Sequence, residues 1–119
     1  MSLVLVDKSA FVRGAEADGE LCLCSVTRME LLYSARSAAD YERIGAALGE
    51  FRELRMDSAT FAAAEAAQRE LADQGRHRVP IPDLLIAACA QQHGADVLHV
   101  DRHFDVLASV LAFTPVRPA

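Results

Sequence analysis

Hydrophobic residues in this chain form two patterns: short unbroken apolar runs, and longer segments with apolar residues at helical spacing. Short apolar runs bounded by turn residues are typical of strands buried on both faces, as in a parallel sheet covered by helices. Three such runs predict strands at residues 3–6, 21–24 and 97–100, and weaker runs predict short strands at 54–56 and 113–116.

The segments between these runs predict helices. A helix after residue 24 is expected to turn Met29, Leu31 and Leu32 toward the core. The alternation of strands and helices predicts a three-layer α/β/α domain with a mostly parallel central sheet. Further helices are predicted at residues 9–17, 40–51, 57–74 and 102–111.

The most hydrophobic segment, residues 79–90, predicts a helix that is buried on every side. Pro82 suits the first turn of a helix, where its missing N–H costs nothing, and residues 84–90 are apolar all round. Asp83 is the exception, a carboxylate at the start of this helix. It is either an ordinary helix-start residue that accepts backbone N–H groups or part of a functional site, and the other acids decide between the two.

The composition fits a single aliphatic domain over residues 1–119. Hydrophobic residues make up 52% of the chain and aromatic residues only 6%, and a chain of this length can bury one core without disulfides. The three cysteines, an odd number without histidines at zinc spacing, predict buried free thiols. No apolar run approaches the roughly 20 residues of a membrane span, and no signal-like segment is visible, so we expect a cytoplasmic protein without membrane association.

The net charge of −5 argues against a surface that binds nucleic acid over its whole extent. Eleven of the twelve basic residues are nevertheless Arg, the side chain suited to bidentate phosphate contacts, so local phosphate recognition stays open. Four basic residues stand close in sequence to acids and are candidates for such contacts, with ordinary surface charge as the alternative for each: Lys8, Arg13, Arg28 and Arg102.

Four acids are expected to meet at one edge of the sheet. Asp7 and Asp101 each end a predicted buried strand, Glu30 stands in the first two turns of the helix after the second strand, and Asp83 begins the buried helix. Ligand sites of parallel sheets lie beyond the carboxyl ends of the strands. We therefore expect all four carboxylates in one crevice.

Crowded carboxylates repel one another and raise each other's pKa unless a cation compensates them. The hard ions Mg²⁺ and Mn²⁺ prefer oxygen ligands, and in nucleases such ions activate water and stabilise the leaving oxygen. The implied reaction is phosphodiester hydrolysis. The same repulsion predicts that neutralising Asp83 or Asp101 raises the melting temperature of the metal-free protein.

Four segments occur in the order seen in one known family: VDKSA at 6–10, SVTRMEL at 25–31, PDLLIA at 82–87 and DRHF at 101–104. On these segments the chain resembles the PIN-domain ribonucleases, and specifically the VapC-type toxins of bacterial toxin–antitoxin pairs. The resemblance covers nearly the whole chain and rests on the four motifs together.

The resemblance implies a three-layer PIN-like domain with endoribonuclease activity on single-stranded RNA. It implies that Asp7, Glu30, Asp83 and Asp101 are the catalytic residues and the ligands of Mg²⁺ or Mn²⁺. It also implies a small cognate antitoxin, whose tail covers the acidic pocket, and a homodimer. The apolar helix face formed by Ile44, Leu48 and Phe51 is a candidate dimer surface.

The chain departs from the family pattern near these acids. Lys8 replaces a frequent small hydroxyl residue, His99 a frequent Thr, and His103 a frequent acid, and the sequence does not assign these three a role. His99 is expected to be a core histidine. Ser9 is a candidate supporting residue, either bonded to a carboxylate or metal-bound water or capping a helix. Asp105 is another candidate, with a solvated helix face as its alternative.

Two other functions are compatible with a small α/β domain of this kind. A phospho-receiver domain needs an acceptor Asp after the central strand and a later Lys, but Asp57 follows a weak strand and no Lys follows Lys8. A non-catalytic PIN-like interaction module is the other alternative. The four intact acids count against it, because an idle pocket would gain stability by losing mutually repelling charges.

Overall fold

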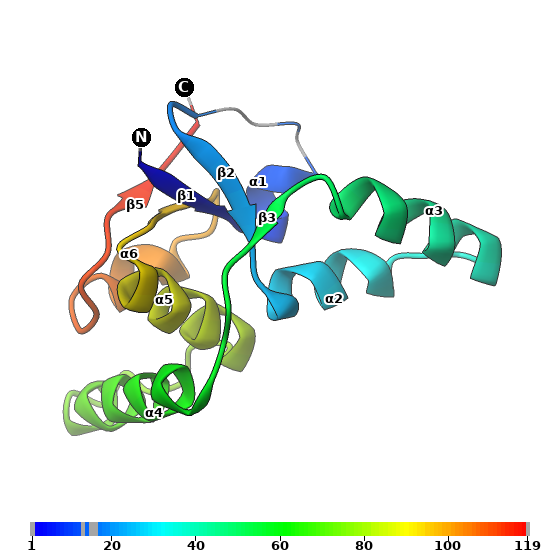
Figure 1. Ribbon diagram of the computed structural model, residues 1–119. Helices are drawn as coiled ribbons and strands as arrows, with labels where there is room; N and C mark the ends of the chain where they lie inside the picture. Colours follow the sequence, from blue (N-terminus) through cyan, green and yellow to red (C-terminus); the bar gives the residue numbers. More distant parts are fainter. Residues whose placement is uncertain (1, 13, 15–16, 119) are drawn as a thin grey trace.

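A five-stranded parallel sheet forms the centre of the computed structural model, which describes residues 2–12, 14 and 17–118 (Figure 1). The strand order is β3-β2-β1-β4-β5, and every neighbouring pair is parallel. The strands are β1 (Leu3–Val6), β2 (Glu20–Leu23), β3 (Arg52–Glu53), β4 (Asp96–Leu98) and β5 (Pro115–Val116). The helices are α1 (Lys8–Phe11), α2 (Ser25–Tyr33), α3 (Ala38–Leu48), α4 (Ser58–Asp73), α5 (Ile81–His93) and α6 (His103–Leu107).

The helices cover both faces of the sheet, each over its own hydrophobic core. Val4 and Val6 of β1 pack with residues of α1, α2 and α3 on one face. Leu5 points to the other face and packs with residues of α4, α5 and α6. This alternation is the period of two that a strand imposes on its side chains. The predicted three-layer α/β/α architecture is confirmed, and the sheet is parallel throughout.

Helix α5 is the buried helix that its apolar sequence predicts. It begins at Ile81 with Pro82 in the first turn, and residues 86–90 are fully buried. Gly94 closes it in the left-handed conformation, with φ of 65°. Helix α4 lies beside α5, and Gln92 Nε2 donates to Asp57 Oδ1 at 2.9 Å, which joins the end of α5 to the start of α4. This bond fixes the end of α5 relative to α4.

Several predicted boundaries were wrong. The helix expected at 9–17 ends at Phe11, and Gly14 follows with φ of 64°; Arg13 and residues 15–16 lie outside the described residues. The strand expected at 54–56 lies at 52–53, and Leu54, which follows it, packs in the core while its N–H donates to the Leu23 carbonyl at 2.8 Å. Helix α6 ends at Leu107 rather than at 111, and Ser109 Oγ donates to the Val106 carbonyl at 2.6 Å in the turn that follows.

The apolar face expected to form a dimer packs within the chain instead. Leu48 is 2% exposed and belongs to the core over α1 to α3, where Ile44 and Phe51 pack against it. Met29, expected in that core, is 60% exposed. It precedes Leu31 by two positions on α2, and two positions turn a side chain by about 200° around a helix, to the opposite face.

Two expectations drawn from the composition concern the cysteines and membrane-spanning segments. Cys22, Cys24 and Cys89 are buried free thiols, as predicted. Within residues 2–12, 14 and 17–118, no helix has both the length and the apolar content needed to cross a membrane.

Candidate active site

Asp7 stands between β1 and α1 at the carboxyl edge of the sheet. Its backbone N–H donates to the Leu98 carbonyl of β4 at 2.9 Å. Its Oδ2 accepts bonds from Ser9 N at 3.0 Å and Ser9 Oγ at 2.6 Å, so that Asp7 caps α1. The side chain is thus held in one orientation, and the residue is only 4% exposed.

Ser9 connects two of the segments that carry acids. Its hydroxyl donates to Asp7 Oδ2, and Ser9 Oγ in turn accepts the Val100 N–H at 3.1 Å. Val100 directly precedes Asp101. Of the two roles considered for Ser9, the bond to a carboxylate is observed, and it ties α1 to the loop after β4.

Asp83 is the acidic residue of α5. It lies in the first turn of that helix and is 7% exposed, and its Oδ2 has no hydrogen-bond partner among the described residues. Burial, the charges of Asp7 and Asp101 and, to a smaller extent, the charge of Glu30 together raise the pKa of Asp83 to about 7. His103 opposes this shift. The fold therefore holds Asp83 where its negative charge lacks compensation.

His103 lies between two of the acids. Its Nδ1 is 2.8 Å from Asp101 Oδ1 and 3.2 Å from Asp83 Oδ2, and its backbone N–H donates to Asp101 Oδ1 at 3.0 Å. Burial favours the neutral form of Asp101, but the hydrogen bond from the His103 backbone N–H and the charge of the His103 ring outweigh it and lower the pKa of Asp101. The pKa of Asp101 is therefore lowered, whereas the pKa of Asp83 is raised.

Glu30 projects from α2 with a buried carboxylate oxygen. Its Oε1 finds no hydrogen-bond partner in the part of the chain that the structure describes. Burial raises the pKa of Glu30, and the charge of Asp7 adds to the effect, while Lys8 opposes it. Glu30 also lines a surface hollow of about 450 Å³ together with Lys8, Val26, Met29 and Tyr33.

These donors fit a divalent cation. Asp83, Asp101 and His103 each offer one ligand atom, and these atoms lie within 4.8 Å of one another. Asp7 and Glu30 stand further out but raise the pKa of Asp83 through their charges. Buried oxygens that lack partners within the described residues, as on Glu30 and Asp83, are unusual unless an ion or water satisfies them.

His99 is buried beside the site, as predicted for a core histidine. Its Nδ1 accepts the Asp101 N–H at 3.1 Å, and its ring packs against Phe104 with centroids 5.1 Å apart. Burial lowers the pKa of His99. Asp105 faces away from the four acids: its Oδ2 accepts from Arg117 Nη2 at 2.9 Å, and its Oδ1 is 3.7 Å from His99 Nε2.

Sequence reasoning gave no role to His103, which lies closest to the acids. The signal available for it was its position, two residues after Asp101 at the start of a helix.

Asp57, the residue weighed as a phosphate acceptor, caps α4 through Ala59 N and Thr60 N. It follows β3, the outermost strand on one side of the sheet, and not a central strand, so the phospho-receiver alternative does not fit.

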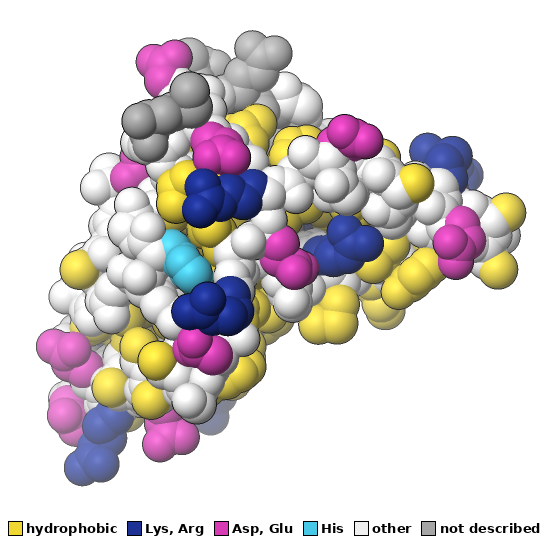
Figure 2. Space-filling model, viewed as in Figure 1, with side chains coloured by type: hydrophobic (Ala, Val, Ile, Leu, Met, Phe, Trp, Pro, Cys, Tyr) yellow, Lys and Arg dark blue, Asp and Glu magenta, His cyan; other side chains and the backbone are white. Residues whose placement is uncertain are grey.

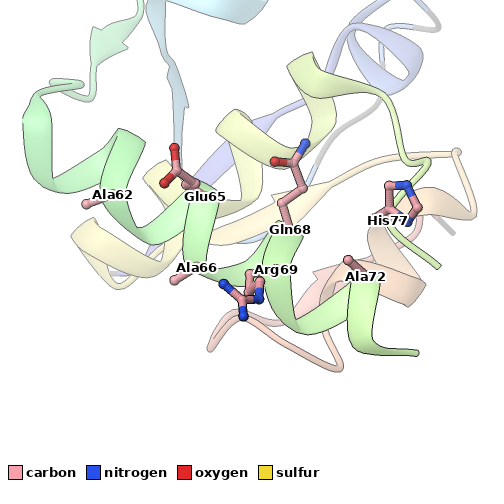
Figure 3. A pocket seen from close by; sticks show the side chains of 7 residues that line it. All are labelled: Ala62, Glu65, Ala66, Gln68, Arg69, Ala72 and His77. Carbon is pink, nitrogen blue, oxygen red and sulfur yellow. The ribbon is translucent and has the colours of Figure 1, made fainter. Parts of the chain in front are cut away.

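Other surface features lie apart from this cluster. A hollow of about 520 Å³ along α4 is lined by Ala62, Glu65, Ala66, Gln68, Arg69, Ala72 and His77, and none of these described residues is one of the four acids (Figure 3). On the face in Figure 2, Lys and Arg side chains are interspersed with Asp and Glu rather than gathered in one basic patch. Hydrophobic side chains appear along the lower edge of the part formed by α2 and α3, on the right of the view (Figure 2).

The comparisons with known proteins agree with this fold. The family model described as "PIN domain" matches residues 4–110, and the chain belongs to the PIN-domain family. Within that family it is related to proteins named Ribonuclease VapC. Ribonuclease VapC17 of Mycobacterium tuberculosis is 40% identical over 92% of this chain and 90% of the relative, and Ribonuclease VapC51 of the same species is 38% identical over 81% and 69%.

Solved structures show the same fold at lower sequence identity. A member of the VapBC family of toxin–antitoxin systems, VapBC-5 from Mycobacterium tuberculosis, superposes with a TM-score of 0.78 at 24% identity, covering 98% of this chain and 99% of that one. DNA-bound VapBC from Salmonella typhimurium gives a TM-score of 0.74 at 20% identity and 98% coverage of both chains.

Proposed function

We propose that this chain is a divalent-metal-dependent endoribonuclease that cleaves single-stranded RNA, the toxin component of a toxin–antitoxin pair. The observation that carries the proposal is the convergence of Asp7, Glu30, Asp83 and Asp101, from four separate elements, on the carboxyl edge of a parallel sheet. The relatives named Ribonuclease VapC support the reaction class.

The four acids would hold Mg²⁺ or Mn²⁺. When bound, such an ion supplies an activated water and stabilises the leaving oxygen of phosphodiester hydrolysis. The chain's own residues orient the ligands: Ser9 fixes the Asp7 carboxylate, and the His99 ring accepts the backbone N–H of Asp101. Asp7 and Asp83 are shielded from bulk water, which strengthens their interaction with a cation.

The hollow beside Glu30 is a suitable place for the RNA strand. Lys8 can contact a phosphate, while the exposed side chains of Met29 and Tyr33 offer an apolar surface on which a base can stack. Arg28 donates to the Gly45 carbonyl at 3.5 Å and so helps to hold α3, whereas Arg102 is exposed at the start of α6. We therefore expect Lys8 and Arg102, rather than Arg28, to contribute phosphate contacts.

Cleavage of a defined single-stranded RNA with each acid replaced by its amide tests the proposal. We expect Asp7→Asn, Glu30→Gln, Asp83→Asn and Asp101→Asn each to lower the rate at least about a hundredfold, because each removes a charged metal ligand. Asp73→Asn, at the exposed end of α4, is the matched control and should keep the wild-type rate. Undiminished cleavage by the four variants would contradict this assignment of the site, and a wild-type chain that does not cleave RNA with either ion would favour the non-catalytic interaction module.

A cognate antitoxin is the expected protein partner. One structural neighbour is a member of the VapBC family of toxin–antitoxin systems, and another is a DNA-bound VapBC. An acidic pocket that accepts a cation can also accept the guanidinium of an Arg side chain, so an antitoxin can block the site with a basic residue. Co-expression with the neighbouring open reading frame should yield a complex and relieve toxicity. Persistent toxicity without a complex would contradict this partner assignment.

A further inference from the structure

We propose that His103 is a nitrogen ligand of the bound ion, together with Asp83 and Asp101, and that it shifts the site toward Mn²⁺, Co²⁺, Ni²⁺ and Zn²⁺ and away from Mg²⁺. This inference rests on the proposed function to the extent that the acids must bind a divalent ion. It adds a ligand of a different chemical type and an order of preference among ions.

The first support is the geometry around the imidazole. His103 Nδ1 lies 2.8 Å from Asp101 Oδ1 and 3.2 Å from Asp83 Oδ2, so a carboxylate from the loop before α6 and one from α5 converge on one nitrogen. One ligand atom from each of the three residues lies within 4.8 Å of the ligand atoms of the other two. Small adjustments of side chains would therefore let all three atoms contact one ion.

The second support is that two of these atoms are buried without hydrogen bonds. Neither Asp83 Oδ2 nor His103 Nδ1 has a hydrogen-bond partner of acceptable geometry among the described residues, although they face each other. Asp83 is 7% exposed, so water does not readily satisfy its oxygen. A cation between the oxygen and the nitrogen would satisfy both, because a neutral imidazole nitrogen and a carboxylate oxygen are each electron-pair donors.

The third support is that the position of His103 is fixed by the fold. It is the first residue of α6, and its backbone N–H is bonded to the Asp101 carboxylate. Phe104, the next residue, is fully buried and anchors α6 in the core. The imidazole is thus held at the mouth of the site, where 36% of its side-chain surface is exposed.

A nitrogen ligand changes which ion the site favours. Mg²⁺ strongly prefers oxygen and binds imidazole poorly, whereas Mn²⁺, Co²⁺, Ni²⁺ and Zn²⁺ accept it. Most divalent sites bind Ni²⁺ more tightly than Mg²⁺, so the preference alone proves nothing about His103. The informative quantity is how far the ratio of Ni²⁺ to Mg²⁺ affinity changes when His103 alone is replaced.

Two measurements on the intact chain test the assignment, and neither measures RNA cleavage. Electron spin-echo spectroscopy of the Mn²⁺-loaded protein should show coupling to nitrogen in wild type, and the coupling should disappear in His103→Asp. Calorimetric titrations with Ni²⁺ and Mg²⁺ should show the affinity ratio falling about tenfold or more in His103→Asp. His77→Gln, a substitution of an exposed loop histidine, should leave both readouts unchanged.

The outcomes separate this inference from the proposed function. If wild type binds Mn²⁺ but shows no nitrogen coupling, His103 is not a ligand, and the four-acid site stands without it; this test needs no variant to fold. An unchanged affinity ratio in His103→Asp would overturn the inference in the same way. If wild type binds neither Mn²⁺ nor Ni²⁺ nor Mg²⁺, the proposed metal-dependent function fails and the ligand assignment fails with it.

Discussion

Asp83 is the residue whose charge the metal-free fold tolerates poorly, since burial and neighbouring acids raise its pKa to about 7. An unfolded Asp titrates near 3.9, so between about pH 4 and pH 7 the folded chain holds a proton that the unfolded chain has lost. The contribution of Asp83 to stability is therefore present at low pH and is lost as pH rises through about 7. The slope is at most about 1.4 kcal/mol per pH unit.

The corresponding substitution is Asp83→Asn. In EDTA at pH 8 this variant should melt at a higher temperature than wild type, and the difference should shrink toward pH 5, where wild-type Asp83 is protonated in the folded state. Thermal melts across this pH range measure it, with Asp73→Asn as the control that should follow wild type. A variant that is less stable than wild type at pH 8 would contradict the electrostatic account of Asp83.

Asp101 should behave in the opposite way, contrary to what the sequence alone suggests. Counting only acids predicts that Asp101→Asn also stabilises the metal-free protein, but His103 compensates the Asp101 charge and lowers its pKa. Its contribution is present above the unfolded pKa and is lost as pH falls toward the folded value. In melts at about pH 6 in EDTA, we expect Asp101→Asn to lose up to about 1 kcal/mol, the scale of a partly exposed ion pair, because the pair with His103 carries opposite charges only when the imidazole is protonated. An increase in stability would show that His103 does not offset the repulsion.

At the scale of elements, Ser9 links α1 to the loop after β4 through its bonds with Asp7 and Val100. Ser9→Ala leaves the Val100 N–H and one Asp7 oxygen without this partner, so we expect stability to fall by about 1 kcal/mol and cleavage by about tenfold to a hundredfold. Ser9→Thr keeps the hydroxyl and should retain most of the activity. Equal losses in the two variants, measured by melts and by RNA cleavage, would point to steric disruption rather than to the hydroxyl.

Elements with strong patterns could be predicted from the sequence, and weakly patterned ends could not. The buried helix α5 follows from residues 84–90, which are apolar all round, and β1 follows from four consecutive apolar residues. In contrast, the short segment 54–56, in which Arg55 separates two apolar residues, was predicted as a strand although Leu54 is a core residue that follows one. Met29 was placed in the core although it precedes Leu31 by two positions, a spacing that puts the two side chains on opposite faces of α2.

The candidate site shows the same division. The topology brings Asp7, Glu30, Asp83 and Asp101 to one edge, and strand ends and helix starts were enough to predict this. His103 was not assigned, because its relation to Asp83 depends on how the first turns of α5 and α6 approach each other. That approach is a tertiary feature without a local sequence signal.

At the scale of the whole molecule, a homodimer remains a prediction. The surface first assigned to it, Ile44, Leu48 and Phe51, packs on the chain's own core, so a dimer must use other residues. Exposed large hydrophobic side chains are available on α2 and α3, at Met29, Tyr33 and Tyr41. Light scattering at micromolar concentration should give twice the mass of the chain, and a monomer mass at that concentration would contradict the prediction.

The central claim is that the acids at the sheet edge form one metal-dependent nuclease centre. The most direct test is metal depletion and add-back with the wild-type chain and a defined single-stranded RNA. Cleavage should stop in excess EDTA and return when Mn²⁺ is added beyond the chelator, while Asp83→Asn should stay inactive under both conditions. Full cleavage in EDTA, or restored cleavage by Asp83→Asn with Mn²⁺, would contradict the claim.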